Sequence, residues 1–134
     1  MNSLALDTNI VLRCLIDDEP RQTAAARALV REAETLFISL PALCEAAWVL
    51  VRGYKLPRTE IADALEFFLD ADKIDTDRAA VDAGLAILRA GGDFADGVIA
   101  YDGLRGNADA FATFDKKAAK LLTQHGLKVH LAVV

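Results

Sequence analysis

Near its start the sequence reads Ser3-Leu4-Ala5-Leu6-Asp7, a short apolar run that ends at a carboxylate. A run of this length, closed by a polar residue, is typical of a buried strand. Directly after it, apolar residues recur at helical spacing, so a helix is predicted over residues 8–17. The sequence therefore predicts a strand that ends in an acid where a helix begins.

The same alternation of strand and helix signals continues to the end of the chain. Further helices are predicted over residues 20–34, 41–51, 61–69, 78–89, 93–104 and 115–122, and further strands over 36–39, 110–114 and 128–134. The acidic stretch 70–77 is interpreted as a loop. Strands separated by helices predict an α/β fold, a parallel sheet of four to five strands covered on both faces. With no repeat and no linker, residues 1–134 are expected to form a single domain.

Composition sets limits on the partners. A chain of 134 residues that is 54% hydrophobic and 26% charged is expected to be compact, with some apolar surface kept for partners. A net charge of −5 argues against a general polyanion binder, unless several acids gather and hold divalent cations. The two cysteines lack CxxC spacing, so reduced thiols are predicted. The sequence shows neither a signal-peptide pattern nor an apolar run long enough for a membrane helix. We therefore expect a cytoplasmic protein without a membrane segment.

Several acids occupy positions where metal ligands are found in such folds. Asp7 and Asp115 follow strands, and ligand sites of parallel sheets lie beyond the carboxyl ends of the strands. Asp96 falls in the first turn of a predicted helix, and Glu45 stands among apolar neighbours, where an unpaired charge is costly. Hard cations such as Mg²⁺ or Mn²⁺ take oxygen ligands of this kind. These positions predict a carboxylate metal site.

Each acid also has a structural alternative. Asp7, Asp93 and Asp115 each precede a predicted helix, where aspartate is among the best N-cap residues. Glu45 could point to solvent or pair with Arg52. The capping role and the metal-binding role therefore both stay open for the aspartates.

Four segments, in order, resemble the motifs of PIN-domain ribonucleases, and of VapC-type toxins in particular. They are residues 4–13 (LALDTNIVLR), 41–50 (PALCEAAWVL), 93–100 (DFADGVIA) and 112–119 (ATFDKKAA). The resemblance covers nearly the whole chain and implies a PIN-like three-layer α/β/α fold. It implies a metal-dependent endoribonuclease, the toxin of a toxin–antitoxin pair, acting as a homodimer and inhibited by a VapB-like antitoxin.

The resemblance also implies roles for individual residues. It implies catalytic metal ligands at Asp7, Glu45, Asp96 and Asp115, around one or two Mg²⁺ or Mn²⁺ ions, with Asp93 as either an extra ligand or a helix cap. Asn9 and Thr113 are expected to orient these acids. Basic side chains near the groove are the candidates for RNA contacts; these are Arg13, Arg52, Lys116 and Lys117.

Other features are interpreted structurally. Trp48 and the pair Phe67-Phe68 are predicted to be core or subunit-interface aromatics. Gly97 and Gly103 are predicted to serve helix packing, with the close approach of a partner or substrate as the alternative. Two other functions remain as alternatives. A Mg²⁺-dependent phosphotransfer or phosphatase domain also places acids at strand ends, although a phosphatase of the HAD type needs an acid at the position of Asn9. A non-catalytic partner-binding module of the same fold is the second alternative.

Overall fold

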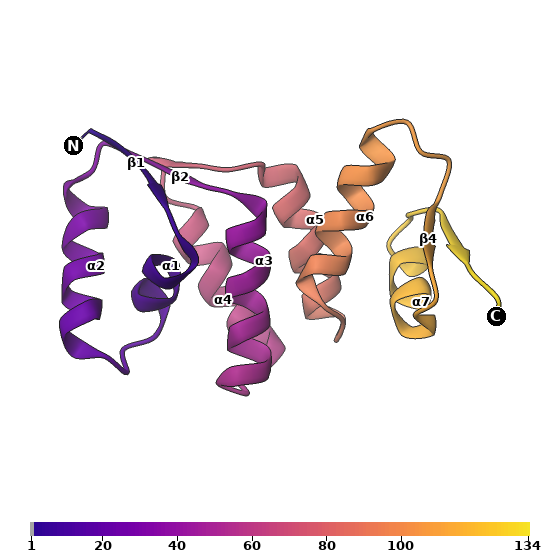
Figure 1. Ribbon diagram of the computed structural model, residues 1–134, viewed down its shortest axis with the longest axis horizontal. Coiled ribbons are helices and arrows are strands. Elements are labelled where there is room, and N and C mark those ends of the chain that lie inside the picture. Colours follow the sequence, from indigo (N-terminus) through magenta and orange to yellow (C-terminus); the bar gives the residue numbers. More distant parts are fainter. Residues whose placement is uncertain (1) are drawn as a thin grey trace. The chain divides into compact units, whose positions relative to one another are not determined.

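The computed structural model describes residues 2–134 and contains, within them, five strands that pair in parallel (Figure 1). The chain divides between Asp77 and Arg78 into two compact units, each with its own sheet. The α/β class with parallel strands is confirmed, and it is consistent with the three-layer arrangement expected. The strands are not all hydrogen-bonded in one central sheet, because three belong to the first unit and two to the second.

The first unit holds a sheet in the order β1-β2-β3. Its elements are β1 Ser3–Leu6, α1 Thr8–Leu15, α2 Pro20–Glu32, β2 Thr35–Ile38, α3 Leu40–Trp48, the π-helix η1 Val49–Gly53, α4 Arg58–Leu69 and β3 Ile74–Asp75. In the register of β1 and β2, Leu6 lies opposite Ile38. The two strands therefore end side by side, and the next residue of each, Asp7 or Ser39, caps the helix that follows.

Helix α3 leads directly into a π-helical turn. The sequence predicted a single helix to residue 51 that stops near Gly53, and the chain does stay helical to Gly53, but in η1 the hydrogen bonds follow the wider π pattern. The backbone N–H of Tyr54 closes η1 on the carbonyl of Val49, at 3.1 Å. Turns of this kind recur at functional sites, because they shift the side chains that follow.

Lys73 connects the sheet to the end of α2. Its Nζ donates hydrogen bonds to the carbonyls of Val30, Arg31 and Ala33, at 2.9, 3.1 and 2.8 Å. The last carbonyls of a helix have no partner within the helix, and a cation near them is also favoured by the helix dipole. Lys73 therefore caps α2.

The second unit contains α5 Arg78–Arg89, α6 Phe94–Arg105, β4 Phe111–Thr113, α7 Lys116–Gln124 and β5 Val129–Leu131. β4 and β5 pair from Phe111 opposite Val129 to Thr113 opposite Leu131. A cluster of buried side chains joins α5, α6 and α7, namely Ile87, Ala100, Ala118, Leu121 and Leu122, and Phe111 and Val129 pack against it. Asp115 follows β4 and caps α7, as the acid after β1 caps α1.

The structure also differs from the sequence prediction at the acidic stretch and at the last strand. The acidic stretch 70–77, expected to be a loop, contains the strand β3 at Ile74–Asp75, which is only two residues long and shows no alternation that a sequence pattern could reveal. The last strand, expected over 128–134, is confined to Val129–Leu131, because β4 offers it only three partners. Among the described residues, no helix is long and apolar enough to cross a bilayer.

Candidate metal and substrate site

Asp7 caps α1 with one of its two oxygens. Its Oδ1 accepts the backbone N–H of Ile10 at 3.0 Å, and the residue is exposed at the carboxyl end of β1. The capping alternative is therefore confirmed for Asp7. Capping does not exclude metal binding, because Oδ2 makes no hydrogen bond to any residue within 2–134.

Asp7 and Glu45 line the same pocket, which has a volume of about 350 Å³. Glu45 stands on α3 with its buried neighbours Ala46 and Ala47 turned to the core, and it is itself exposed. Within the described chain Glu45 has no ion-pair partner, so the alternative of pairing with Arg52 is wrong, whereas exposure to solvent is right. The first unit thus brings together two of the acids that the sequence singled out. We call this space the Asp7–Glu45 pocket; Thr8, Asn9, Leu12 and Val49 complete its lining.

The second unit brings together three acids. Asp96 lies in the first turn of α6 and is half-buried. Burial, and then the charges of Asp93 and Asp115, raise the pKa of the Asp96 carboxyl above its ordinary value. Like charges close together raise a pKa because each disfavours the ionised form of the other. Asp93, Asp96 and Asp115 are therefore neighbours in an environment that would favour a cation.

Asp115 and Asp93 differ as helix caps. Oδ1 of Asp115 accepts the backbone N–H of Ala118 at 3.0 Å, so Asp115 caps α7. Asp93 occupies the N-cap position of α6, yet within residues 2–134 its carboxylate makes no capping hydrogen bond to the helix. The capping role is therefore confirmed for Asp115 but not for the side chain of Asp93.

Gly97 lets α6 approach α5 closely beside Asp96. A Cβ on Gly97 would lie 2.4 Å from the carbonyl oxygen of Ala83 and 2.9 Å from the Cα of Gly84, which are backbone atoms that cannot move aside. The packing role predicted for Gly97 is confirmed. For Gly103 it is wrong, because apart from its chain neighbours and the backbone of its own helix no described atom lies within 4 Å of a Cβ placed there.

The donor set suits a hard divalent cation. All the acids concerned supply carboxylate oxygens, and Mg²⁺ keeps several waters, so that one or two carboxylates plus a substrate phosphate are enough to hold it. Within residues 2–134, no group of three or more His, Cys, Asp or Glu side chains has the geometry to hold a metal ion by itself. The acids fit Mg²⁺ or Mn²⁺ in chemistry, and each unit supplies them as a local group.

The two residues expected to orient the acids have definite partners. Oδ1 of Asn9, in the Asp7–Glu45 pocket, accepts a hydrogen bond from Arg13 Nε at 3.4 Å. Oγ1 of Thr113 accepts the backbone N–H of Asp115 at 3.0 Å, which holds the turn between β4 and α7.

The candidate RNA-binding residues fall into two classes. Arg13 is engaged within the protein, since its Nη1 forms an ion pair with Asp18 and its side chain is only 14% exposed. Asp18 lies in the loop between α1 and α2, and no local spacing in the sequence predicts its ion pair with Arg13. Arg52, Lys116 and Lys117 are exposed. The two lysines begin α7, where the helix dipole disfavours cations, so folding alone does not explain them.

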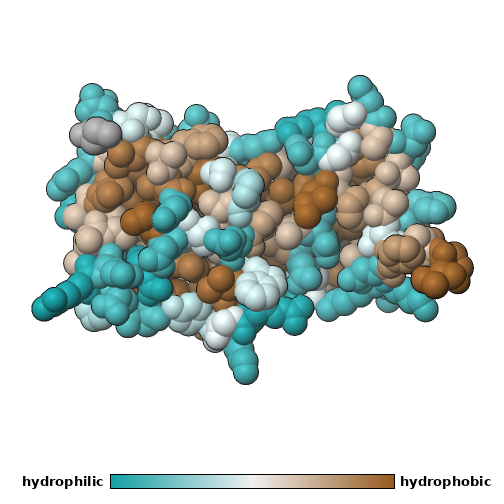
Figure 2. All heavy atoms as spheres, viewed as in Figure 1, coloured by the Kyte–Doolittle hydropathy of each residue, from teal (hydrophilic) through white to brown (hydrophobic). Residues whose placement is uncertain are grey.

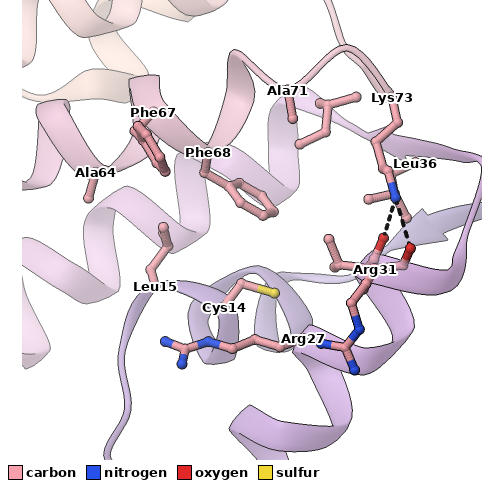
Figure 3. A pocket seen from close by; sticks show the side chains of 12 residues that line it. Cys14, Leu15, Arg27, Arg31, Leu36, Ala64, Phe67, Phe68, Ala71 and Lys73 are labelled. Atoms are coloured by element: carbon pink, nitrogen blue, oxygen red, sulfur yellow. Dashed lines mark hydrogen bonds between the residues drawn. The ribbon is translucent and has the colours of Figure 1, made fainter.

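A second pocket of the first unit is apolar and has a volume of about 420 Å³ (Figure 3). Leu15 and Cys14 of α1 and Phe68 of α4 point into it, and Arg27 and Arg31 of α2 lie along its edge. Neither arginine has an ion-pair partner among residues 2–134. Cys14, like Cys44, is a free thiol, and burial raises the pKa of both thiols, which suits unreactive cysteines.

Figure 2 shows apolar residues on the surface of one face. Several aromatic side chains are among the exposed large hydrophobic residues. Trp48 is 62% exposed and Phe67 is 85% exposed, so neither belongs to the core, whereas Phe68 is half-buried. Of the two roles predicted for these residues, the core role is wrong for Trp48 and Phe67, and the interface role stays a prediction.

Comparison with known proteins gives one result. The family model described as PIN domain matches residues 4–121, most of the chain, including all the acids discussed above. No curated protein matches the chain.

Proposed function

Because the chain belongs to the PIN domain family, whose members are generally nucleases, we propose that it is a divalent-metal-dependent endoribonuclease. In this proposal Asp7, Glu45, Asp96 and Asp115 are the metal-binding and catalytic residues, with Asp93 as a further ligand or a contact through water. One observation carries the proposal. Within residues 2–134 none of these four acids pairs with a basic side chain, although each unit holds its acids close together.

Such groups of acids are costly without a cation. Like charges repel, and burial of Asp96 adds a desolvation penalty to its ionised form. Proteins tolerate this at functional sites, where the strain serves binding or catalysis. When bound, Mg²⁺ or Mn²⁺ would activate water and stabilise the charge that develops on a phosphoryl group.

The chain's own residues would hold and orient the reacting groups. The helix caps fix Oδ1 of Asp7 and of Asp115, so that the other oxygen of each carboxylate keeps a set direction. Thr113 holds the turn that carries Asp115. Lys116, Lys117 and Arg52 would contact the RNA backbone, since exposed cations near an acidic site attract phosphates.

We further propose that the protein is a VapC-type toxin of the cytoplasm, inhibited by a VapB-like antitoxin. The apolar pocket supports this partner. Arg27 and Arg31 stand one helical turn apart at its edge, where two cations repel each other, and exposed Phe67 of α4 flanks it. An acidic amphipathic segment of the antitoxin would cover the apolar lining and neutralise both arginines. Exposed Trp48 is a candidate contact of a homodimer.

The test compares purified wild type with Asp96→Asn and Glu45→Gln on single-stranded RNA, with Mg²⁺ and with chelator. Wild type should cleave only with metal, and both variants should lose at least a hundredfold in rate, because they lose charge at nearly constant shape. Lys120→Met, an exposed change on α7, is the matched control.

Other outcomes would favour the alternatives. Turnover of a phosphomonoester without RNA cleavage would support a phosphatase. If neither unit binds metal and the protein still binds a partner protein, a non-catalytic module would be supported.

A further inference from the structure

Arg13 connects α1 to the loop that follows it. From α1, its Nε donates to Oδ1 of Asn9 at 3.4 Å, and its Nη1 pairs with Oδ1 of Asp18, in the loop after the helix. The guanidinium is rigid and planar, so these two contacts fix its orientation. Because the side chain is 14% exposed, little of it is left for a contact with RNA.

Asp18 is in turn held from a distant part of the chain. Its Oδ2 accepts the hydroxyl of Tyr54 at 2.6 Å, and Tyr54 is the residue that closes the π-helix η1. This hydrogen bond, followed by the charge of Arg13, lowers the pKa of the Asp18 carboxyl. Asp18 is therefore a charged acceptor that serves two donors. We call Asn9, Arg13, Asp18 and Tyr54 the Arg13 network.

The network determines which atoms Asn9 offers to the Asp7–Glu45 pocket. An amide has one acceptor oxygen and one group with two N–H donors. The oxygen of Asn9 faces Arg13, which has no acceptor atom, so the amide cannot turn over without losing this bond. Within residues 2–134 the Asn9 amide group donates to no acceptor, although the residue lines the pocket with two carboxylates.

We propose that Arg13 is a positioning residue that keeps the N–H donors of Asn9 directed at the substrate, so that Asn9 binds a non-bridging oxygen of the scissile phosphate. This proposal rests on the proposed ribonuclease function. In this proposal Asn9 acts through its N–H groups and not as a metal ligand, since its oxygen faces the guanidinium of Arg13. It acts instead as a neutral donor between two anions, which relieves the repulsion between the phosphate and the carboxylates of the pocket. The π-helical turn contributes by placing Tyr54 where it can hold Asp18.

The orientation of Asn9 is tested without any reaction. In the NMR spectrum of the whole chain, Asn9→Ala identifies the pair of side-chain amide signals of Asn9. In Arg13→Lys these signals should move toward the values of a free amide, because lysine keeps the charge beside Asp18 but lacks the second N–H branch that reaches Asn9. Unchanged signals in Arg13→Lys would overturn the positioning role, whether or not the protein cleaves RNA.

The role in the reaction is tested by a double-mutant cycle on RNA cleavage. Arg13→Lys should lower kcat/KM about tenfold, less than the hundredfold or more that loss of a whole donor costs. The Mg²⁺ concentration for half-maximal rate should stay within about twofold of wild type, since no metal ligand changes. In an Asn9→Ala background, Arg13→Lys should have no further effect on cleavage, while its effect on the melting temperature persists.

Arg78→Lys is the control, because Arg78 forms an ion pair with Asp82 in the second unit, although that pair is more exposed than the pair of Arg13 with Asp18. A purely structural role for Arg13 predicts equal losses of rate in the presence and in the absence of Asn9, and that result would contradict the proposal. If wild type cleaves no RNA at all, the ribonuclease proposal fails and the phosphate role of Asn9 fails with it, while the NMR result still decides whether Arg13 orients the amide.

Discussion

A single aspartate can cap a helix and still bind a cation, because its carboxylate has two oxygens. Asp7 and Asp115 are both in this position, with Oδ1 on a backbone N–H and Oδ2 directed elsewhere. The two roles that the sequence left open are therefore compatible at these residues. Substitutions that affect only one role can separate them.

We predict that Asp7→Asn and Asp7→Ala abolish cleavage equally but differ in stability. Asparagine caps a helix as well as aspartate does, so Asp7→Asn should melt within a degree or two of wild type. Alanine loses the bond to Ile10 and should cost about 1 kcal/mol, a few degrees in Tm. Thermal unfolding without metal measures this difference. Equal melting temperatures for the two variants would show that the cap contributes nothing.

Asp96→Asn is predicted to stabilise the metal-free protein at neutral pH. The pKa of Asp96 is raised, first by burial and then by Asp93 and Asp115, so the folded state holds this proton more tightly than the unfolded state. Stability therefore falls as the pH rises from about 4, the ordinary pKa, through the raised value. Asparagine removes this penalty, so Tm should rise by up to a few degrees at pH 7 and be unchanged at about pH 3. A loss of stability at pH 7 would contradict the prediction.

At the scale of elements, glycines determine how closely two helices of the second unit pack. Gly97 of α6 lies against the backbone of α5, and Gly84 of α5 leaves room for Phe94 and Val98. Asp96 is next to Gly97 in α6 and is half-buried, so a change in the packing of the helices is expected to alter the surroundings of the acid as well.

Gly97→Ala should destabilise the protein by about 1–3 kcal/mol, because the added methyl would meet the Ala83 carbonyl and force the helices apart. Gly103→Ala on the same helix is the control. Apart from its chain neighbours and the backbone of its own helix, no described atom lies within 4 Å of a Cβ placed at Gly103. Alanine favours helix over glycine by about 1 kcal/mol, so this variant should be more stable. Chemical denaturation of both variants measures the contrast, and similar effects in the two would rule out the packing explanation.

At the scale of the whole molecule, the chain carries a net charge of −5, and within residues 2–134 Asp7, Glu45, Asp96 and Asp115 pair with no basic side chain. Anything that binds only the folded chain raises its melting temperature. A cation held by these acids is therefore expected to stabilise the protein.

We predict that millimolar Mg²⁺ or Mn²⁺ raises the Tm of wild type, and that Asp7→Asn and Asp96→Asn each weaken the binding. The double variant should bind the ion no more tightly than either single variant. Calorimetric titration of the four proteins measures the affinities. Unchanged affinity in both single variants would contradict the prediction.

The sequence by itself determined the order of strands and helices and the acids that follow β1 and β4. It also determined the family to which the chain belongs. Apolar periodicity and capping residues act over a few neighbouring positions, so α5 at Arg78–Arg89 and β1 at Ser3–Leu6 could be predicted to the residue. Tertiary structure alone decided the rest. The strand β3 exists only because β2 lies beside it, Glu45 shares a pocket with Asp7 only because their helices pack, and Asp18 meets Tyr54 across 36 positions. No local sequence pattern predicts such contacts, because burial of the core brings together segments that are distant in the sequence.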